Sequence, residues 1–359
     1  MSAKSHTQAQ AAAHGLIAAV ALVATTGGCG LVAGIDDREL YTGATGGQGG
    51  STSSGGGDQG GLGGEGGGCA PPAGGWPDSK QICFGGVGGA CPEGEDGALL
   101  NVAPDYEFCP GEEIVHDKVT DLYWQRVAHG GSSSPFEWED ADAYCSNLSL
   151  GGMENWEIPV LRDLVSLANF GLSSPMIDNK FSQEANSFWA RQKMSANQYW
   201  VVHFERGRVT FWHKSGALGS LMVRCVHGGP TSSNFVPSQS DPTVIDTTLG
   251  LEWLMTTSGQ LTWQSSLNYC NNLPAAGGGW RMPNIKELLT IYRTTIPPSF
   301  PDPFESQPLN SYWSSTPDQG GASEAYAVHY DPANLTDGAA RREDATSVFL
   351  ARCVRNAPQ

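Results

Sequence analysis

The chain has 359 residues and a formal net charge of −17, with eight histidines and nine cysteines. This acidic balance excludes the basic surface that nucleic-acid binding needs, and it disfavours a simple electrostatic attraction to anionic lipid or sulfated glycans. The sequence has no CxxC pair and no HExxH motif, which are common metal-binding patterns. We therefore expect no metal, no cofactor and no nucleic-acid partner.

The N-terminal segment predicts export. Residues 15–30, GLIAAVALVATTGGCG, contain an apolar run of signal-peptide length that is too short to span a bilayer. Cys29 follows small residues, as the lipidated cysteine of a bacterial lipoprotein does. We expect residues 1–29 to be a signal peptide that ends at a lipidated Cys29. The protein would then be an outer-membrane or cell-surface lipoprotein, attached to the membrane only through its lipid, and otherwise a secreted protein.

Two segments separate this signal from the folded part of the chain. Residues 30–68 are rich in Gly, Ser and Thr, which predicts a disordered linker. Residues 69–110 contain too few apolar side chains for a core of their own, but they hold four cysteines. We expect a small cap with two disulfides, and the sequence does not choose among the three possible pairings of Cys69, Cys83, Cys91 and Cys109.

The rest of the chain is an internal duplication. WEDADAYC at 138–145 matches WQSSLNYC at 263–270, and LMVRCV at 221–226 matches FLARCV at 349–354. The period is as long as a domain, which excludes a solenoid of short repeats. We define copy one as residues 111–228 and copy two as residues 241–356, with a turn-rich linker at 229–240.

Both cysteines of each copy are expected to face the core. Apolar positions at helical spacing place Cys145 and Cys270 on the buried stripe of a first helix that starts at the matched tryptophan. Alternation in the last strand turns Cys225 and Cys353 inward. We therefore predict the disulfides Cys145–Cys225 and Cys270–Cys353, each worth about 4–5 kcal/mol in the chain-entropy model.

A second helix is predicted in each copy, with a proline in its first turn. Trp156 precedes Pro159, and Trp280 precedes Pro283, by the same spacing. Each proline is followed by an apolar stripe at helical spacing. The two tryptophans are expected to be buried at these junctions, and stacking on sugar is the alternative.

Polar side chains in the predicted strands have two interpretations each. His203 and His329 match each other, and they are either functional or simply hydrogen-bonded strand residues. Arg224 and Arg352 lie between apolar residues, so each is expected to pair with an internal carboxylate.

The ordered motifs TxGLxW, YCxxL, WRxPxxxEL, YWSST and RCV together resemble the C-terminal domain of the Legionella collagen-like adhesin. Copy two carries all five. Copy one departs, with Asp121 in place of the glycine, Glu157 in place of Arg281 and FWARQ in place of YWSST, and the sequence does not decide whether copy one keeps any shared ligand site. The layout is also similar to the C-type lectin-like fold. The expected fold class is therefore α+β, with two tandem C-type lectin-like domains, each having two helices and a small, mainly antiparallel sheet.

The resemblance implies a non-enzymatic surface adhesin that recognises a glycan or matrix partner. A carbohydrate site needs exposed aromatic rings beside polar groups, which points to Tyr312, Trp313, Ser314 and Ser315 together with Arg281. Burial of these strand residues is the alternative. A structural envelope scaffold that binds other proteins is the second hypothesis. An enzyme related to sulfatase-modifying proteins is the third, and it is disfavoured because the cysteines are explained as disulfide partners.

Overall fold

The computed structural model describes residues 104–131, 136–215, 221–228, 233–294, 298–304, 310–319, 323–331, 335 and 338–358. All of them belong to one compact unit, residues 63–359, whereas the other unit, residues 1–62, lies outside the described residues. The predicted signal peptide, Cys29, the Gly-rich linker and most of the cap also lie outside them. No helix among the described residues has the length and apolar character needed to cross a membrane.

Copy one consists mainly of strands. A four-stranded antiparallel sheet has the order β1-β2-β3-β9 and comprises β1 Tyr106–Phe108, β2 Ile114–Asp117, β3 Leu122–Gln125 and β9 Val226–His227. The other elements are the helices α1 Trp138–Ser146 and α2 Leu161–Ser166 and the strands β4 His129–Gly130, β5 Ser187–Ser195, β6 Gln198–His203, β7 Arg208–His213 and β8 Leu221–Val223. Because β1 pairs with β2, the end of the predicted cap is part of copy one's sheet. Cys109 there is disulfide-bonded.

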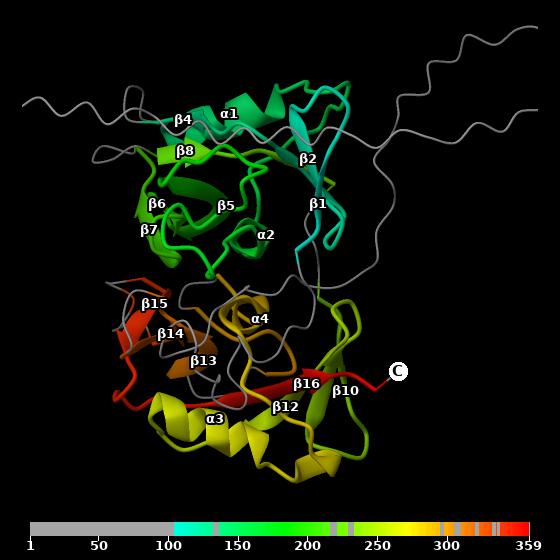
Figure 1. Ribbon diagram of the computed structural model, residues 1–359, viewed down its shortest axis with the longest axis vertical. Coiled ribbons are helices and arrows are strands. Elements are labelled where there is room, and N and C mark those ends of the chain that lie inside the picture. Colours follow the sequence, from blue (N-terminus) through cyan, green and yellow to red (C-terminus); the bar gives the residue numbers. More distant parts are fainter. Residues whose placement is uncertain are drawn as a thin grey trace, which may run out of the picture. The chain divides into compact units, whose positions relative to one another are not determined.

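Copy two repeats this order. Its four-stranded antiparallel sheet is β10-β11-β12-β16, formed by β10 Phe235–Pro237, β11 Thr243–Asp246, β12 Leu251–Thr257 and β16 Arg352–Asn356. The remaining elements are α3 Trp263–Asn271, the short 3₁₀ helix η2 Ala275–Gly277, α4 Ile285–Thr290, β13 Ser311–Pro317, β14 Glu324–His329 and β15 Ala340–Asp344. The prediction of two short α-helices in each copy is thus confirmed, but the described chain is mostly β (Figure 1).

The sheets of the two copies are not separate, which corrects the prediction of a small sheet in each domain. One eight-stranded sheet runs in the order β13-β14-β15-β7-β6-β5-β8-β4, and only the β5–β8 pairing in it is parallel. Strands β7 and β15 join the copies through the pair Val209–Ala340. Helices α2 and α4 also contact each other across this junction. Pairing of two edge strands from different copies could not be seen in either repeat alone.

The largest apolar core extends across both copies. It contains Leu164, Trp200 and Tyr292, among others, and it lies around the joined sheet and the helices α2 and α4. Two smaller cores lie further out, one in each copy, and each surrounds a disulfide. Because the main core is shared, the two copies form one folded unit.

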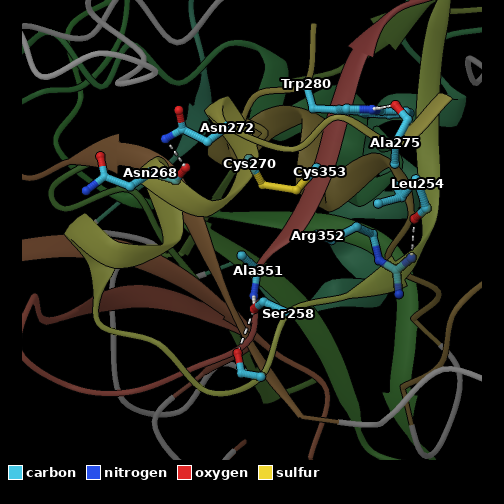
Figure 2. The surroundings of a disulfide bond; sticks show 11 residues. Leu254, Ser258, Asn268, Cys270, Asn272, Ala275, Trp280, Ala351, Arg352 and Cys353 are labelled. Atoms are coloured by element: carbon cyan, nitrogen blue, oxygen red, sulfur yellow. Dashed lines mark hydrogen bonds between the residues drawn. A yellow bond between two sulfur atoms is a disulfide. The ribbon is translucent and has the colours of Figure 1, made fainter. Parts of the chain in front are cut away.

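Both predicted disulfides are present. Cys145 is bonded to Cys225 and Cys270 to Cys353, and all four side chains are buried. Figure 2 shows the second bond linking α3 to β16. Each bond therefore fixes the first helix of its copy to the last strand, as the inward-facing positions predicted.

The entry to the second helix is built in the same way in both copies. Trp156 and Trp280 are buried, which confirms the packing interpretation. The prolines do not lie in the first helical turn, because α2 begins at Leu161 and α4 at Ile285, each two residues after its proline. Asn284 caps α4 in a reciprocal capping box with Glu287, a pattern that stabilises helix starts.

Candidate functional site

The strand predicted to bind a ligand is buried. Every residue of β13 is buried, including Tyr312, Trp313, Ser314 and Ser315. The Trp313 indole N–H donates to the Leu261 carbonyl (3.0 Å), and Ser314 donates to the Tyr326 carbonyl (2.7 Å). The polar groups of Trp313 and Ser314 are therefore bonded to backbone carbonyls inside the fold, and the strand does not form the exposed platform that sugar stacking would need.

Arg281, the fifth predicted ligand residue, anchors the helix entry instead. Its guanidinium forms two hydrogen bonds to the Glu287 carboxylate, at 2.7 and 2.6 Å, and both side chains are buried. Glu287 is also the capping-box residue of α4. In copy one Glu157 occupies the matching position and forms an ion pair with Arg191 on β5. The matching positions therefore carry opposite charges and pair with different elements, with α4 in copy two and with β5 in copy one, where the pair is partly exposed.

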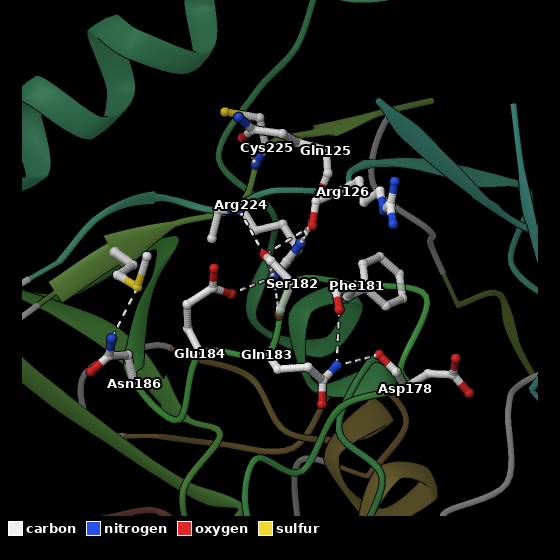
Figure 3. Close-up of polar contacts among 12 residues, drawn as sticks. Gln125, Arg126, Asp178, Phe181, Ser182, Gln183, Glu184, Asn186, Arg224 and Cys225 are labelled. Carbon is white, nitrogen blue, oxygen red and sulfur yellow. Dashed lines mark hydrogen bonds and ion pairs between the residues drawn. The ribbon is translucent and has the colours of Figure 1, made fainter. Parts of the chain in front are cut away.

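The two strand arginines are held in the interior by different partners. Arg224 donates to the Gln125 and Arg126 carbonyls and pairs with Glu184 at 3.3 Å, so the predicted carboxylate partner is confirmed (Figure 3). Burial lowers the pKa of Arg224 to about 10. Arg352 donates to the Leu254 carbonyl at 2.9 Å and lies over the ring of Phe300.

Those contacts give both arginines a structural role. A buried guanidinium is tolerated when carbonyls, carboxylates and aromatic faces replace its water. The closing strand of each copy carries one such residue directly before the disulfide cysteine.

Each of the matched histidines forms a hydrogen bond with a serine on the neighbouring strand. Ser187 lies 2.6 Å from Nδ1 of His203, and Ser311 lies 2.7 Å from Nδ1 of His329. Burial, and then the charge of Arg208, lower the pKa of His203 to about 4, so this imidazole is neutral at pH 7. In copy two, Nε2 of His329 lies 3.2 Å from Glu343.

Ser311, His329 and Glu343 are residue types that can form a nucleophile, base and orienting acid. However, Ser311 and His329 are only 2% and 1% exposed, between strands of the joined sheet. A substrate could not reach the Ser311 hydroxyl there. This arrangement therefore supports the interpretation of both histidines as hydrogen-bonded strand residues.

An aromatic hollow lies on copy one, and it was not predicted. Its volume is about 780 Å³, it is open to solvent, and it is lined by Phe136, Asp140, Ala143, Tyr144, Asn147, Leu148 and Ser149. Asp140, Ala143 and Tyr144 share one face of α1 because they recur at helical spacing, and Asn147 is the residue that caps the end of this helix.

Three aromatic rings contact one another at this hollow. The His129 ring stacks on Tyr144 with 4.0 Å between centroids, and the Phe136 ring meets His129 edge-on at 4.9 Å. The Tyr144 hydroxyl accepts a hydrogen bond from Gln125 (2.7 Å), which fixes the ring. His129 comes from β4 and Tyr144 from α1, so the cluster forms only when β4 adds to the edge of the sheet.

Copy two does not repeat the aromatic cluster. Aligning α1 with α3 places Leu261 at the position of Phe136 and Tyr269 at that of Tyr144. In the described part of copy two, Tyr269 has no stacked ring partner. The feature suited to an aromatic ligand contact is thus in copy one, the copy that departs from the family motifs.

The described residues also contain no group of three or more His, Cys, Asp or Glu side chains placed to hold a metal ion. Comparison with known proteins gives one family match. The model described as the Lcl C-terminal domain matches residues 113–227 and 242–355, which correspond to the two copies. No curated protein matches the chain.

Proposed function

We propose, from the premise that this chain belongs to the Lcl C-terminal domain family, that it is an exported, surface-anchored, adhesin-like protein that binds a glycan without converting it. The family match supports the adhesin-like role. The N-terminal apolar run and Cys29 support export and lipid anchoring. The observation that carries glycan recognition is the aromatic hollow on α1.

The chemistry of this hollow suits a sugar. Pyranose rings present apolar C–H faces that stack on aromatic rings, which Phe136 and Tyr144 supply as half-buried side chains. Sugar hydroxyls need hydrogen-bonding groups beside the rings, and Asp140, Asn147 and Ser149 are exposed there. Binding of this kind requires no metal, so the lectin-like activity is expected to be independent of calcium.

Charge at the hollow favours a neutral glycan. Glu137 and Asp140 are exposed at the start of α1, and neither forms an ion pair with a residue that the structure describes. Sulfated or carboxylated sugars would be repelled by these carboxylates and by the net charge of −17. The sugar is therefore expected to be uncharged.

Avidity is expected to come from many chains on one surface and not from the two copies within one chain. Since the aromatic cluster is present in one copy only, each chain would offer one such site. Many chains anchored by lipid on one surface would still bind a repetitive glycan or matrix partner together. Copy two would stabilise copy one, which carries the glycan site, through the joined sheet and the shared core.

A glycan array with the full, oxidised chain tests this proposal, with and without calcium. The key variant is Tyr144→Leu, which removes the ring, and the matched control is Tyr269→Leu at the same position of α3. His129→Ala and Asp140→Ala change exposed side chains and should leave the fold intact. We expect binding to neutral glycans that Tyr144→Leu and His129→Ala abolish and Tyr269→Leu retains.

Two results would count against it. A folded, disulfide-intact chain that binds no glycan would favour the scaffold hypothesis, in which the protein binds other envelope proteins. Glycan binding that is unchanged in Tyr144→Leu would place the glycan site elsewhere in the chain.

A further inference from the structure

A second, more enclosed depression lies at the junction of the two copies. Its basic part has a volume of about 310 Å³ and is lined by Arg206 and Arg208 from copy one and by Glu324, Arg341 and Arg342 from copy two. An adjoining hollow of about 340 Å³ shares Arg206 and Arg342 with it. We call the two together the junction groove.

Positive charge is concentrated in the basic part of this groove although the chain is acidic, whereas the lining of the adjoining hollow also includes Glu205 and Asp318. Four arginines face one glutamate in the basic part. Arg341 pairs with Glu343 at 2.8 Å and Arg342 with Asp318 at 2.8 Å. These two charges are therefore partly neutralised by carboxylates of copy two.

The positive charges of Arg208 and Arg206 are less well neutralised by carboxylates. Arg208 forms no ion pair with any residue of the described chain, and its Nε is buried without an acceptor there. The positive charge of Arg208 also helps to lower the pKa of His203. Among the described residues, Arg206 forms an ion pair only with the exposed Glu205, at 3.5 Å in solvent, where such a pair contributes little. The groove therefore keeps positive charge that an incoming anion could balance.

The adjoining hollow has an apolar floor. Phe170, Met176 and Tyr326 line it, with Leu172 at the rim, where 40% of the leucine is exposed. The rings of Phe170 and Tyr326 meet edge-on at 4.9 Å. The Tyr326 hydroxyl of copy two donates to the Arg206 carbonyl of copy one at 2.9 Å, which ties the two copies together at the groove.

We propose that the junction groove binds a small organic carboxylate with an apolar body. The carboxylate lies among Arg206, Arg208 and Arg342, because a guanidinium matches a carboxylate with paired N–H donors. The apolar body covers Phe170 and Met176 in the adjoining hollow. Binding bridges the two copies and is separate from glycan recognition on α1, since the two hollows have no lining residue in common.

Isothermal titration of the full, oxidised chain with octanoate tests the proposal. Acetate supplies the carboxylate alone, and octanamide supplies the apolar body without the charge. We expect octanoate to bind at least about tenfold more tightly than either, because both parts of the groove must be occupied.

Two variants separate the contributions. Arg208→Gln should weaken octanoate binding by about tenfold or more through the loss of a charge-assisted contact. Leu172→Ser, at the exposed rim, removes an apolar contact without adding charge, so it should weaken octanoate binding but leave acetate binding unchanged. Lys193→Gln removes an exposed positive charge of β5 outside the groove and should bind octanoate as the wild type does.

The outcomes distinguish this proposal from the glycan proposal. A folded wild-type chain that does not bind octanoate, or equal binding by the wild type and Arg208→Gln, would overturn the groove assignment. Neither result affects the aromatic hollow. Tyr144→Leu should bind octanoate normally, whatever its effect on glycans.

Discussion

Val209 and Ala340 pair with each other in the eight-stranded sheet, and they occupy the same position in the two copies. Val209 pairs with Val202 on its other side, and Ala340 pairs with Val328, which is the residue that matches Val202. The contact thus resembles the self-complementary interface of a two-fold dimer, formed here within one chain. A duplication that preserved such an interface explains why the main core belongs to both copies.

Gly338 should be essential to this junction. It has φ +105°, and a Cβ added there would lie 2.5 Å from the Val209 carbonyl oxygen. Gly338→Ala should lower the free energy of unfolding by about 2–4 kcal/mol, through backbone strain and displacement of β7. Gly250→Ala is the control, because Gly250 also has positive φ but has open space around it. Equal losses in the two variants, measured by urea unfolding, would show that the junction is not constrained at Gly338.

Arg281 and Arg191 should differ strongly in their contribution to stability. Arg281 is in a buried, doubly hydrogen-bonded pair with Glu287, and its removal leaves a buried charge at the capping box. Arg281→Ala should therefore cost about 3–5 kcal/mol. Arg191 pairs with Glu157 at a partly exposed site, so Arg191→Ala should cost about 1 kcal/mol or less. Similar losses in chemical denaturation would contradict the assigned structural role of Arg281.

Removal of either disulfide should destabilise the whole unit. The bonds close loops with sequence separations of 80 and 83 residues. Each Cys→Ser pair should lower the free energy of unfolding by about 2–5 kcal/mol. Because the copies share a core, calorimetry should still show one transition for residues 104–358 in both variants. Two resolved transitions would mean that the copies unfold independently.

His203 should make stability depend on pH in a defined window. Its folded pKa of about 4 lies below the ordinary value of 6.5, so between these pH values the unfolded chain binds a proton that the folded chain does not. This contribution to stability is present above pH 6.5 and is lost as the pH falls towards 4. Between pH 7 and pH 5 the loss is about 2 kcal/mol.

The comparison of the wild type with His203→Gln measures this loss directly. The stability difference between them should shift by about that amount in favour of the variant at pH 5. His213→Gln, at an exposed site, should follow the wild type. A pH-independent difference would mean that His203 titrates normally in the folded protein.

Local patterns in the sequence predicted the features that lie within one copy. The helical spacing of Cys145 and the alternation at Cys225 were sufficient to predict their disulfide, because both elements are regular and amphipathic. The burial of Trp156 and Trp280 was predicted from their place at the entry to the second helix, where a tryptophan anchors packing. The burial of Tyr312 and Trp313 could not be decided from the sequence, because a strand of aromatic residues with flanking serines can lie on a surface or in a core where a serine hydroxyl donates to a carbonyl.

Features that need two distant segments could not be predicted. The aromatic hollow requires β4 to bring His129 onto Tyr144, and nothing local to either residue indicates this contact. The junction groove likewise requires β7 and β15 to pair, and each strand alone looks like an ordinary edge. Once the Val209–Ala340 pair is known, the clustering of Arg206, Arg208, Arg341 and Arg342 follows from their proximity in sequence.

The most direct test of glycan recognition is isothermal titration of the full chain with the best neutral glycan found on the array. The account predicts that Tyr144→Leu weakens binding by at least about tenfold, since stacking of an aromatic ring contributes one or more kcal/mol, whereas Tyr269→Leu binds as the wild type does. Equal affinity in the wild type and Tyr144→Leu, with both proteins folded and oxidised, would contradict the assignment of the site to α1.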